Sequence, residues 1–214
     1  MKRILPIFII LVIIIAAIFV FFKNNDKIKN FGNNISTTED LQNYILNITS
    51  YEAEVEVTVQ SNKTTNTYKL KQKYSKEGTF KQEVLEPENI AGTTIIQDEE
   101  SLKVENTKLN LQKIYENYSY IANNNLCLEY FIKDFLESQD ASTREENGSL
   151  ILETTVKNES KYISKKVLYV DTKTGKPTKM EIKDHTQNTI VYILYNEINI
   201  NSLQKMEVLA FKLL

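Results

Sequence analysis

Few residues in this chain have the chemistry for acid–base, nucleophilic or metal work. The 214 residues include one histidine, His185, and one cysteine, Cys127. His185 stands between two predicted strands in "KDHTQN", where a solvated turn residue is the main expectation. Cys127 is flanked by Leu126 and Leu128, which is typical of a buried, inert thiol inside a helix. A zinc site would need more soft ligands than these two.

Other catalytic motifs are also missing from the sequence. It contains no glycine-rich phosphate loop, nucleophile elbow or H-E-x-x-H segment. The stretch "VLEPENIAGTTII" at 84–96 places Gly92 before a β-branched run, which predicts a turn between strands and not a phosphate site. We therefore predict no catalytic, cofactor-binding or metal-binding residues, and a protein that is not an enzyme.

Charge and cysteine content argue against two further classes of protein, those that bind nucleic acid and those held together by internal disulfides. The chain has 26 basic and 28 acidic residues and a net charge of −2, so no overall basic field favours nucleic acid. A single cysteine rules out an internal disulfide framework. The lysines at 69, 71 and 73 could attract an anionic polymer, but such a row is more often the wet face of a sheet.

The N-terminal stretch predicts a membrane segment. After Met1, Lys2 and Arg3, residues 4–22 carry no charge, and this length is close to the roughly 20 residues that span a bilayer. The run is longer than the ~7–15 apolar residues of a secretory signal, which favours an uncleaved signal-anchor, although cleavage stays open. The short basic leader predicts a single-pass protein of the cell membrane with its domain outside the cytoplasm.

The rest of the chain divides into a tether, one domain and a tail. Residues 23–35 are polar and predict a linker, 36–202 a single domain, and 203–214 a C-terminal tail. The domain opens with Ser36 and Glu39 at capping-box spacing, which predicts a short amphipathic helix.

Strict alternation in "YEAEVEVTVQ" predicts a strand from Tyr51 with one buried face. The next run, "TYKLKQKYS", alternates in the same way. A hairpin that turns near Lys63 and Thr64 would pair Glu56 with Lys71, and these opposite charges would specify the register.

Further short strands predict an antiparallel meander that a helical region at 109–138 interrupts. Within that region the segment 111–124 is ambiguous and partly helical in pattern, and "LCLEYFIKDFLES" predicts a helix with Asn125 as its cap. Strands resume near Gly148. The final run, 190–195, is apolar on both faces, which predicts a central strand buried on both sides.

Two segments resemble a known superfamily. "YKLKQKYSKEGTFKQEVLEPENIAGTTIIQDEESLKVEN" is similar to the part of LolA-, LppX- and RseB-like lipoprotein-carrier proteins in which a strand leads into a "P-e-n-x-x-G" turn. "KKVLYVDTKTGKPTKMEIKD" looks like the same superfamily's later hairpin. An anchored, single-domain, Asn- and Lys-rich chain most resembles the germination lipoprotein GerS and GerS-related proteins, although it has no lipobox cysteine.

The resemblance implies an α+β fold, with a curved antiparallel half-open β-barrel covered by helices and no catalysis. It also implies two candidate functions. In the first, the domain is a GerS-like binding module outside the cytoplasm, with the spore envelope as one setting. It would use a sheet edge or groove to support a peptidoglycan amidase in cortex modification and germination.

In the second, the domain carries lipid or lipoprotein, with an acyl chain in an apolar cavity. The residues we expect to line this cavity are Tyr51, Val55, Val57, Val59, Tyr68 and Leu70.

Overall fold

The computed structural model describes residues 37–61, 63–76, 79–97, 101–116, 125–156 and 163–201. The predicted anchor at 4–22, the linker and the C-terminal tail lie outside these ranges. Among the described residues, no helix has the length and apolar character needed to cross a membrane.

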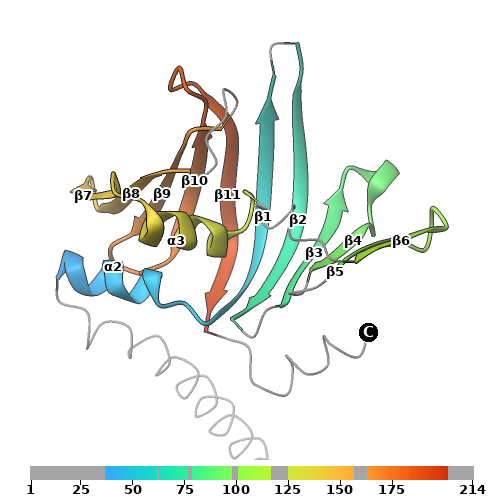
Figure 1. Ribbon diagram of the computed structural model, residues 1–214, viewed down its shortest axis with the longest axis horizontal. Coiled ribbons are helices and arrows are strands. Elements are labelled where there is room, and N and C mark those ends of the chain that lie inside the picture. Colours follow the sequence, from blue (N-terminus) through green and yellow to red (C-terminus); the bar gives the residue numbers. More distant parts are fainter. Residues whose placement is uncertain are drawn as a thin grey trace, which may run out of the picture.

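The described residues form one large antiparallel sheet with two α-helices on one of its faces (Figure 1). Eleven strands follow the order β6-β5-β4-β3-β2-β1-β11-β10-β9-β8-β7. Their bounds are β1 Ser50–Gln60, β2 Thr65–Ser75, β3 Thr79–Glu86, β4 Thr94–Gln97, β5 Ser101–Asn106, β6 Leu111–Glu116, β7 Ser142–Glu146, β8 Ser149–Thr155, β9 Lys165–Asp171, β10 Pro177–Lys183 and β11 Thr189–Ile200. The first strand pairs with the last, which joins the two halves of the chain in the centre of the sheet.

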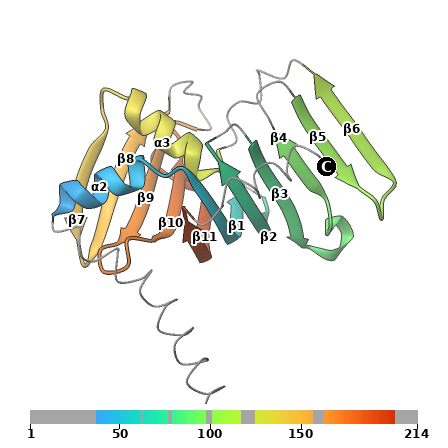
Figure 2. The same cartoon turned by 90° about the horizontal axis from the view of Figure 1, so that it is seen from below.

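The sheet is open, so the expectation of a half-open barrel holds only as a curved antiparallel sheet. Strands β6 and β7 are its two edges and do not pair with each other. Helices α2 and α3 lie over the half formed by β7–β11, whereas β4–β6 extend away from them (Figure 2). The α+β assignment is confirmed.

Both predicted helices form, with different caps from those expected. Helix α2, Thr38–Leu46, begins after Thr37, whose hydroxyl accepts from Asp40 N while the Asp40 carboxylate accepts from Thr37 N. This capping box lies one residue further along the chain than the predicted one. Helix α3, Leu128–Glu137, has Cys127 and not Asn125 at its N-cap.

The β1–β2 hairpin has the predicted faces but a register shifted by two residues. Glu54 lies opposite Lys71, where the prediction placed Glu56, and Val55 lies opposite Leu70. The cause is the turn, because Gln60 pairs with Thr65 and the loop begins at Ser61, whose hydroxyl bonds Thr64 O. An even shift keeps each side chain on its own face.

Two other predictions were wrong in part. Residues 111–116 form strand β6 and not a helix, because they pair along their whole length with β5. Strand β11 is central, but it is buried mainly on one face. Val191 and Ile193 are buried, whereas Leu194 on the other face is 41% exposed because no described helix covers that side.

The stretch 84–96 contains the predicted turn, between the end of β3 at Glu86 and the start of β4 at Thr94. The Gly92 N–H donates to Val84 O at 2.8 Å, and Gly92 has a φ of +83°, a conformation that suits glycine. The side chain of Asn106 on β5 is 1% exposed and donates to Thr93 Oγ1 at 2.8 Å, so the β5–β6 hairpin holds this corner in place.

Candidate functional site

The residues singled out for chemistry do not form a catalytic group. His185 is exposed in the turn between β10 and β11, where Asp184 organises the backbone by accepting from Thr186 and Asn188. Within the described part of the chain, no cluster of three or more His, Cys, Asp or Glu could hold a metal ion.

Cys127 is buried, as predicted, but it precedes α3 instead of lying inside it. Burial raises the pKa of its thiol from 9.0 to about 12, and the hydrogen bond between this thiol and the Tyr51 hydroxyl only partly offsets the effect of burial. A thiol that stays protonated at neutral pH is a poor nucleophile and a poor metal ligand.

The six residues predicted to line a cavity all lie on the helix-covered face of β1 and β2. Tyr51, Val55, Val57 and Leu70 are at most 3% exposed and belong to the main core cluster. Val59 and Tyr68 are half-buried and pack against that cluster towards the hairpin tip. The structure thus brings the six together, and their role in binding an acyl chain stays a prediction.

A buried polar cluster joins these strands to the start of α3. The Tyr51 hydroxyl accepts from Leu128 N at 3.3 Å and lies 3.0 Å from Cys127 Sγ. Gln72, which is fully buried, donates to Leu126 O at 3.2 Å and to Gln82 Oε1 at 3.3 Å. Gln72 occupies an apolar-face position of β2, and this break in the alternation was the sequence signal for the cluster.

Among the residues that the structure describes, the Tyr195 hydroxyl and Asn125 Oδ1 are buried near this cluster without a hydrogen-bond partner. Tyr195 is 8% exposed, and burial raises the pKa of its hydroxyl well above 10.0, with nearby Cys127 adding to the effect. The described protein groups therefore satisfy only part of the hydrogen-bonding capacity of the polar atoms in and near this cluster.

Removing the hydroxyl of Tyr51 should destabilise the protein, whereas removing that of Tyr195 should not. Tyr195→Phe is expected to leave the free energy of unfolding unchanged or raise it by about 1–3 kcal/mol, since an unpaired buried hydroxyl is costly. Tyr51→Phe should lower it by about 1–3 kcal/mol, because Leu128 N–H loses its acceptor. Urea denaturation at pH 7 measures both. Equal losses in the two variants would show that the Tyr195 hydroxyl has a bound partner such as water.

The same variants should change the response to alkali. Burial raises the pKa of Tyr51 and Tyr195 above 10.0, so above that pH the unfolded chain loses protons that the folded chain keeps. Stability is therefore full below pH 10 and falls as the pH rises further. In each phenylalanine variant the free energy of unfolding should fall less steeply than in the wild type as the pH rises above 10.

The inner face of β4–β6 continues the core face beyond the helices. Gln97 marks this side, since it donates to the Tyr130 hydroxyl of α3 at 3.0 Å. Gln97 pairs with Leu102 on β5, and Leu102 pairs with Tyr115 on β6, so these three side chains lie on the same face. Other residues of this face are Ile95, Val104, Leu111 and Lys113. Apart from Leu102, these residues are half-buried or exposed, so no helix or strand in the described part of the chain covers this largely apolar and aromatic surface.

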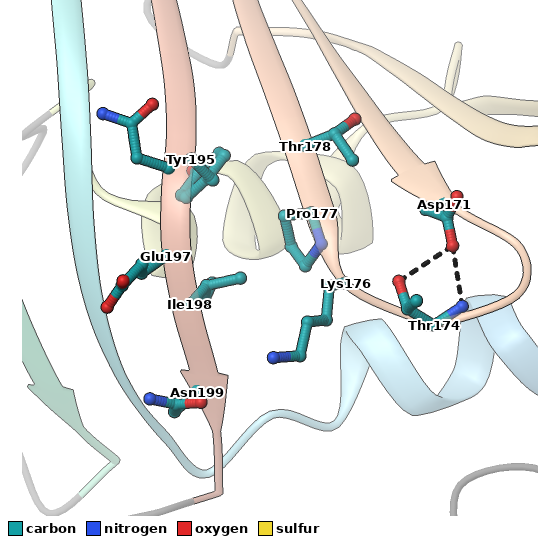
Figure 3. A pocket seen from close by; sticks show the side chains of 10 residues that line it. Asp171, Thr174, Lys176, Pro177, Thr178, Tyr195, Glu197, Ile198 and Asn199 are labelled. Carbon is teal, nitrogen blue, oxygen red and sulfur yellow. Dashed lines mark hydrogen bonds between the residues drawn. The ribbon is translucent and has the colours of Figure 1, made fainter. Parts of the chain in front are cut away.

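A separate pocket of about 450 Å³ lies beside the end of β11 (Figure 3). Its lining mixes apolar Pro177 and Ile198 with charged Lys176 and Glu197. At its rim, Asp171 Oδ1 accepts from Thr174 N at 2.7 Å, which shapes the β9–β10 turn. None of the predicted cavity residues lies in it, and its mixed lining suits a polar group better than an acyl chain.

Comparison with known families shows to which protein family the chain belongs. The model of the family described as "Sporulation protein YdcC-like" matches residues 1–208. The chain belongs to the YdcC-like sporulation protein family. A comparison with curated proteins found no match. The resemblance to the LolA-like superfamily and GerS, stated from the sequence, is confirmed.

Solved structures show what this YdcC-like protein is similar to. An uncharacterized conserved protein from Thermus thermophilus has a TM-score of 0.52 at 11% identity, with 80% of this chain and 92% of that one covered, so the two share a fold. A chain in the structure of the CwlD amidase from Clostridioides difficile with the GerS lipoprotein is 28% identical, with 79% and 96% covered and a TM-score of 0.45. A LolA superfamily protein from Nitrosomonas europaea is 12% identical, with 80% and 97% covered and a TM-score of 0.42.

Proposed function

We propose that this YdcC-like protein is a non-catalytic binding protein of sporulating cells that supports a peptidoglycan amidase in spore cortex modification and germination. Residues 4–22 anchor it in the cell membrane, and the domain lies outside the cytoplasm. Membership of a sporulation family and the GerS-like sequence segments support the setting. The partner class is the one named with GerS in the C. difficile complex.

The open inner face of β4–β6 carries this proposal. Val104 lies directly opposite Ile95 on one side and Lys113 on the other, and Tyr115 is diagonal to Val104 on the same face. Interface cores are enriched in aromatic residues, and binding energy concentrates in a few such anchors. The half of the sheet under the helices packs as one core, and the inner face of β4–β6 adjoins this core. A rigid support and an exposed apolar face together suit a protein partner.

Capture from sporulating cells tests the proposal. The full chain with an affinity tag should retain a cell-wall amidase, identified by mass spectrometry. Ile95→Lys on the inner face should reduce the amidase in the captured material at least tenfold, because one desolvated charge at an interface core costs more than ~1.4 kcal/mol.

Thr94→Lys is the matched control. Thr94 neighbours Ile95 on the same short strand and faces the other side, so this variant should retain the amidase. Both variants must melt like the wild type for the comparison to count. Absence of any wall amidase from the wild-type capture would overturn the proposal. If both variants lost the captured amidase to the same extent, the amidase would contact a surface other than the inner face of β4–β6.

A further inference from the structure

Strand β11 is paired over different lengths on its two sides. It pairs with β1 from Val191 to Ile200, but with β10 only from Thr189 to Leu194. Strand β10 begins at Pro177, which has no N–H to donate, so its ladder with β11 cannot continue past this residue. Beyond Leu194, no strand in the described part of the chain pairs with the β10 side of β11.

Two β-bulges lie where the pairing between β10 and β11 ends. Asn196 is skipped in the register between β11 and β1, and Thr178 is skipped in the register between β10 and β9. A residue inserted in this way bends its strand. The pocket of about 450 Å³ occupies this place, with residues 195–199 on one side and 176–178 on the other (Figure 3). The two strands therefore separate around a cavity at the open side of β11.

Two opposite charges line the pocket without an ion pair. Lys176 and Glu197 are exposed, and neither forms an ion pair with another described residue. Figure 3 shows Lys176 reaching from the β10 side towards β11. The other charged residue of the lining, Asp171, is already engaged, because its Oδ1 accepts from Thr174 N and Lys173 N. A ligand with one negative and one positive group would complement Lys176 and Glu197.

We infer that this pocket binds a short peptide with free termini, held in an extended conformation along the open side of β11. The N–H and C=O groups of β11 that point to this side pair with the peptide backbone, as with an added strand. The peptide carboxylate lies at Lys176 and its ammonium group at Glu197. Because Glu197 stands directly opposite Glu54 on β1, this ammonium group also reduces the repulsion between two carboxylates.

The dimensions of the pocket suit a peptide of about three residues. From Tyr195 to Ile198 the open side of β11 extends over roughly 10 Å, at about 3.3 Å per residue. The volume lies within the ~300–1,000 Å³ of small-ligand sites. Pro177 and Ile198 are buried parts of the lining, so small apolar side chains such as alanine fit best. Strands β1–β3 separate the pocket from β4–β6, so the inference does not depend on the proposed amidase partner.

Isothermal titration calorimetry of the full chain with trialanine tests the site. A C-terminal amide on the peptide should weaken binding roughly threefold, and so should an N-terminal acetyl group, because each removes one exposed charge pair. N-methylation of both peptide amides should weaken binding roughly tenfold or more, because it removes the backbone donors that pair with β11.

Variants of the two charged residues assign the ends of the peptide. Lys176→Met should bind trialanine and its C-terminal amide equally, while it still prefers the peptide with a free amino group. Glu197→Gln should show the reverse, with no preference between trialanine and its acetylated form. Lys173→Met is the matched control, because Lys173 is exposed in the same turn and does not line the pocket. It should bind trialanine like the wild type.

This pattern of losses in capped peptides and matched variants would support the inference. Absence of trialanine binding at about 10 mM would overturn it. Binding that is unchanged by the two caps, or unchanged by N-methylation, would overturn it as well. An equal loss in Lys173→Met and Lys176→Met would show attraction to the charge of the whole turn, which also contradicts the site. All three variants change exposed side chains, and a Tm equal to that of the wild type verifies that each one folds.

Discussion

Replacing Asp134 with alanine is expected to lower the free energy of unfolding by about 3–5 kcal/mol, because it leaves a buried lysine without its partner. Lys166 on β9 is 1% exposed, and its Nζ lies 2.6 Å from Asp134 Oδ2 on α3. Burial lowers the pKa of Lys166 even though Asp134 acts in the opposite direction, so the charged form depends on this contact. Urea denaturation at pH 7 measures the loss.

A second ion pair nearby is the control. Lys165 on β9 and Glu153 on β8 lie 2.6 Å apart on the other face of the sheet, but their side chains are 27% and 23% exposed. Partly exposed pairs contribute less, so Glu153→Ala should cost at most about 1 kcal/mol. The double variant Asp134→Ala with Lys166→Met should recover much of the loss. A cost for Asp134→Ala no larger than that for Glu153→Ala would show that Lys166 reaches solvent when its partner is removed.

Replacing Phe131 with alanine should also lower the free energy of unfolding by about 3–5 kcal/mol, the usual cost of a cavity left by a buried aromatic ring. Phe131 is fully buried on the sheet-facing side of α3, and its ring centroid lies 6.0 Å from that of Phe135. Leu136→Ala is the matched control, because Leu136 on the same helix is 64% exposed. Its expected cost is below about 0.5 kcal/mol.

This second prediction also bears on the lipid-carrier alternative. A helix that packs on a solid core loses most of its contacts when Phe131 is truncated. A helix that covers an acyl-chain cavity would lose fewer, because part of its face would already be empty. A measured cost near that of Leu136→Ala would therefore favour the cavity, and native mass spectrometry of the full chain for retained acyl cargo would then be the next measurement.

Sequence patterns predicted the elements whose signal is local. Alternation identified β1 and assigned the buried face of Tyr51, Val55 and Val57 correctly. The segment that became β6 has a mixed pattern, and its identity as a strand comes from pairing with β5. Helix caps were displaced by one or two residues, because several neighbouring residues can cap and the chain path on either side selects among them.

The candidate surfaces were predictable only in part. The buried Gln72 and Lys166 each interrupt an apolar face, so the sequence could have flagged them. Their partners could not have been named, because Lys166 and Asp134 are 32 residues apart in the chain. The period of a pattern reports which face a side chain occupies and says nothing of which distant residue it meets.

Local sequence patterns were enough to assign the class of the protein: an α+β chain with a strand-rich domain and the motifs of a LolA-like family. Which strands are edges, and which surface the described helices leave uncovered, could be seen only in the folded chain. Pairing of β1 with β11 puts the two ends of the domain in the middle of the sheet. Strands β6 and β7 then become the edges, and the two helices pack over the β7–β11 half. These features depend on long-range backbone pairing, which local hydrophobic patterns do not encode.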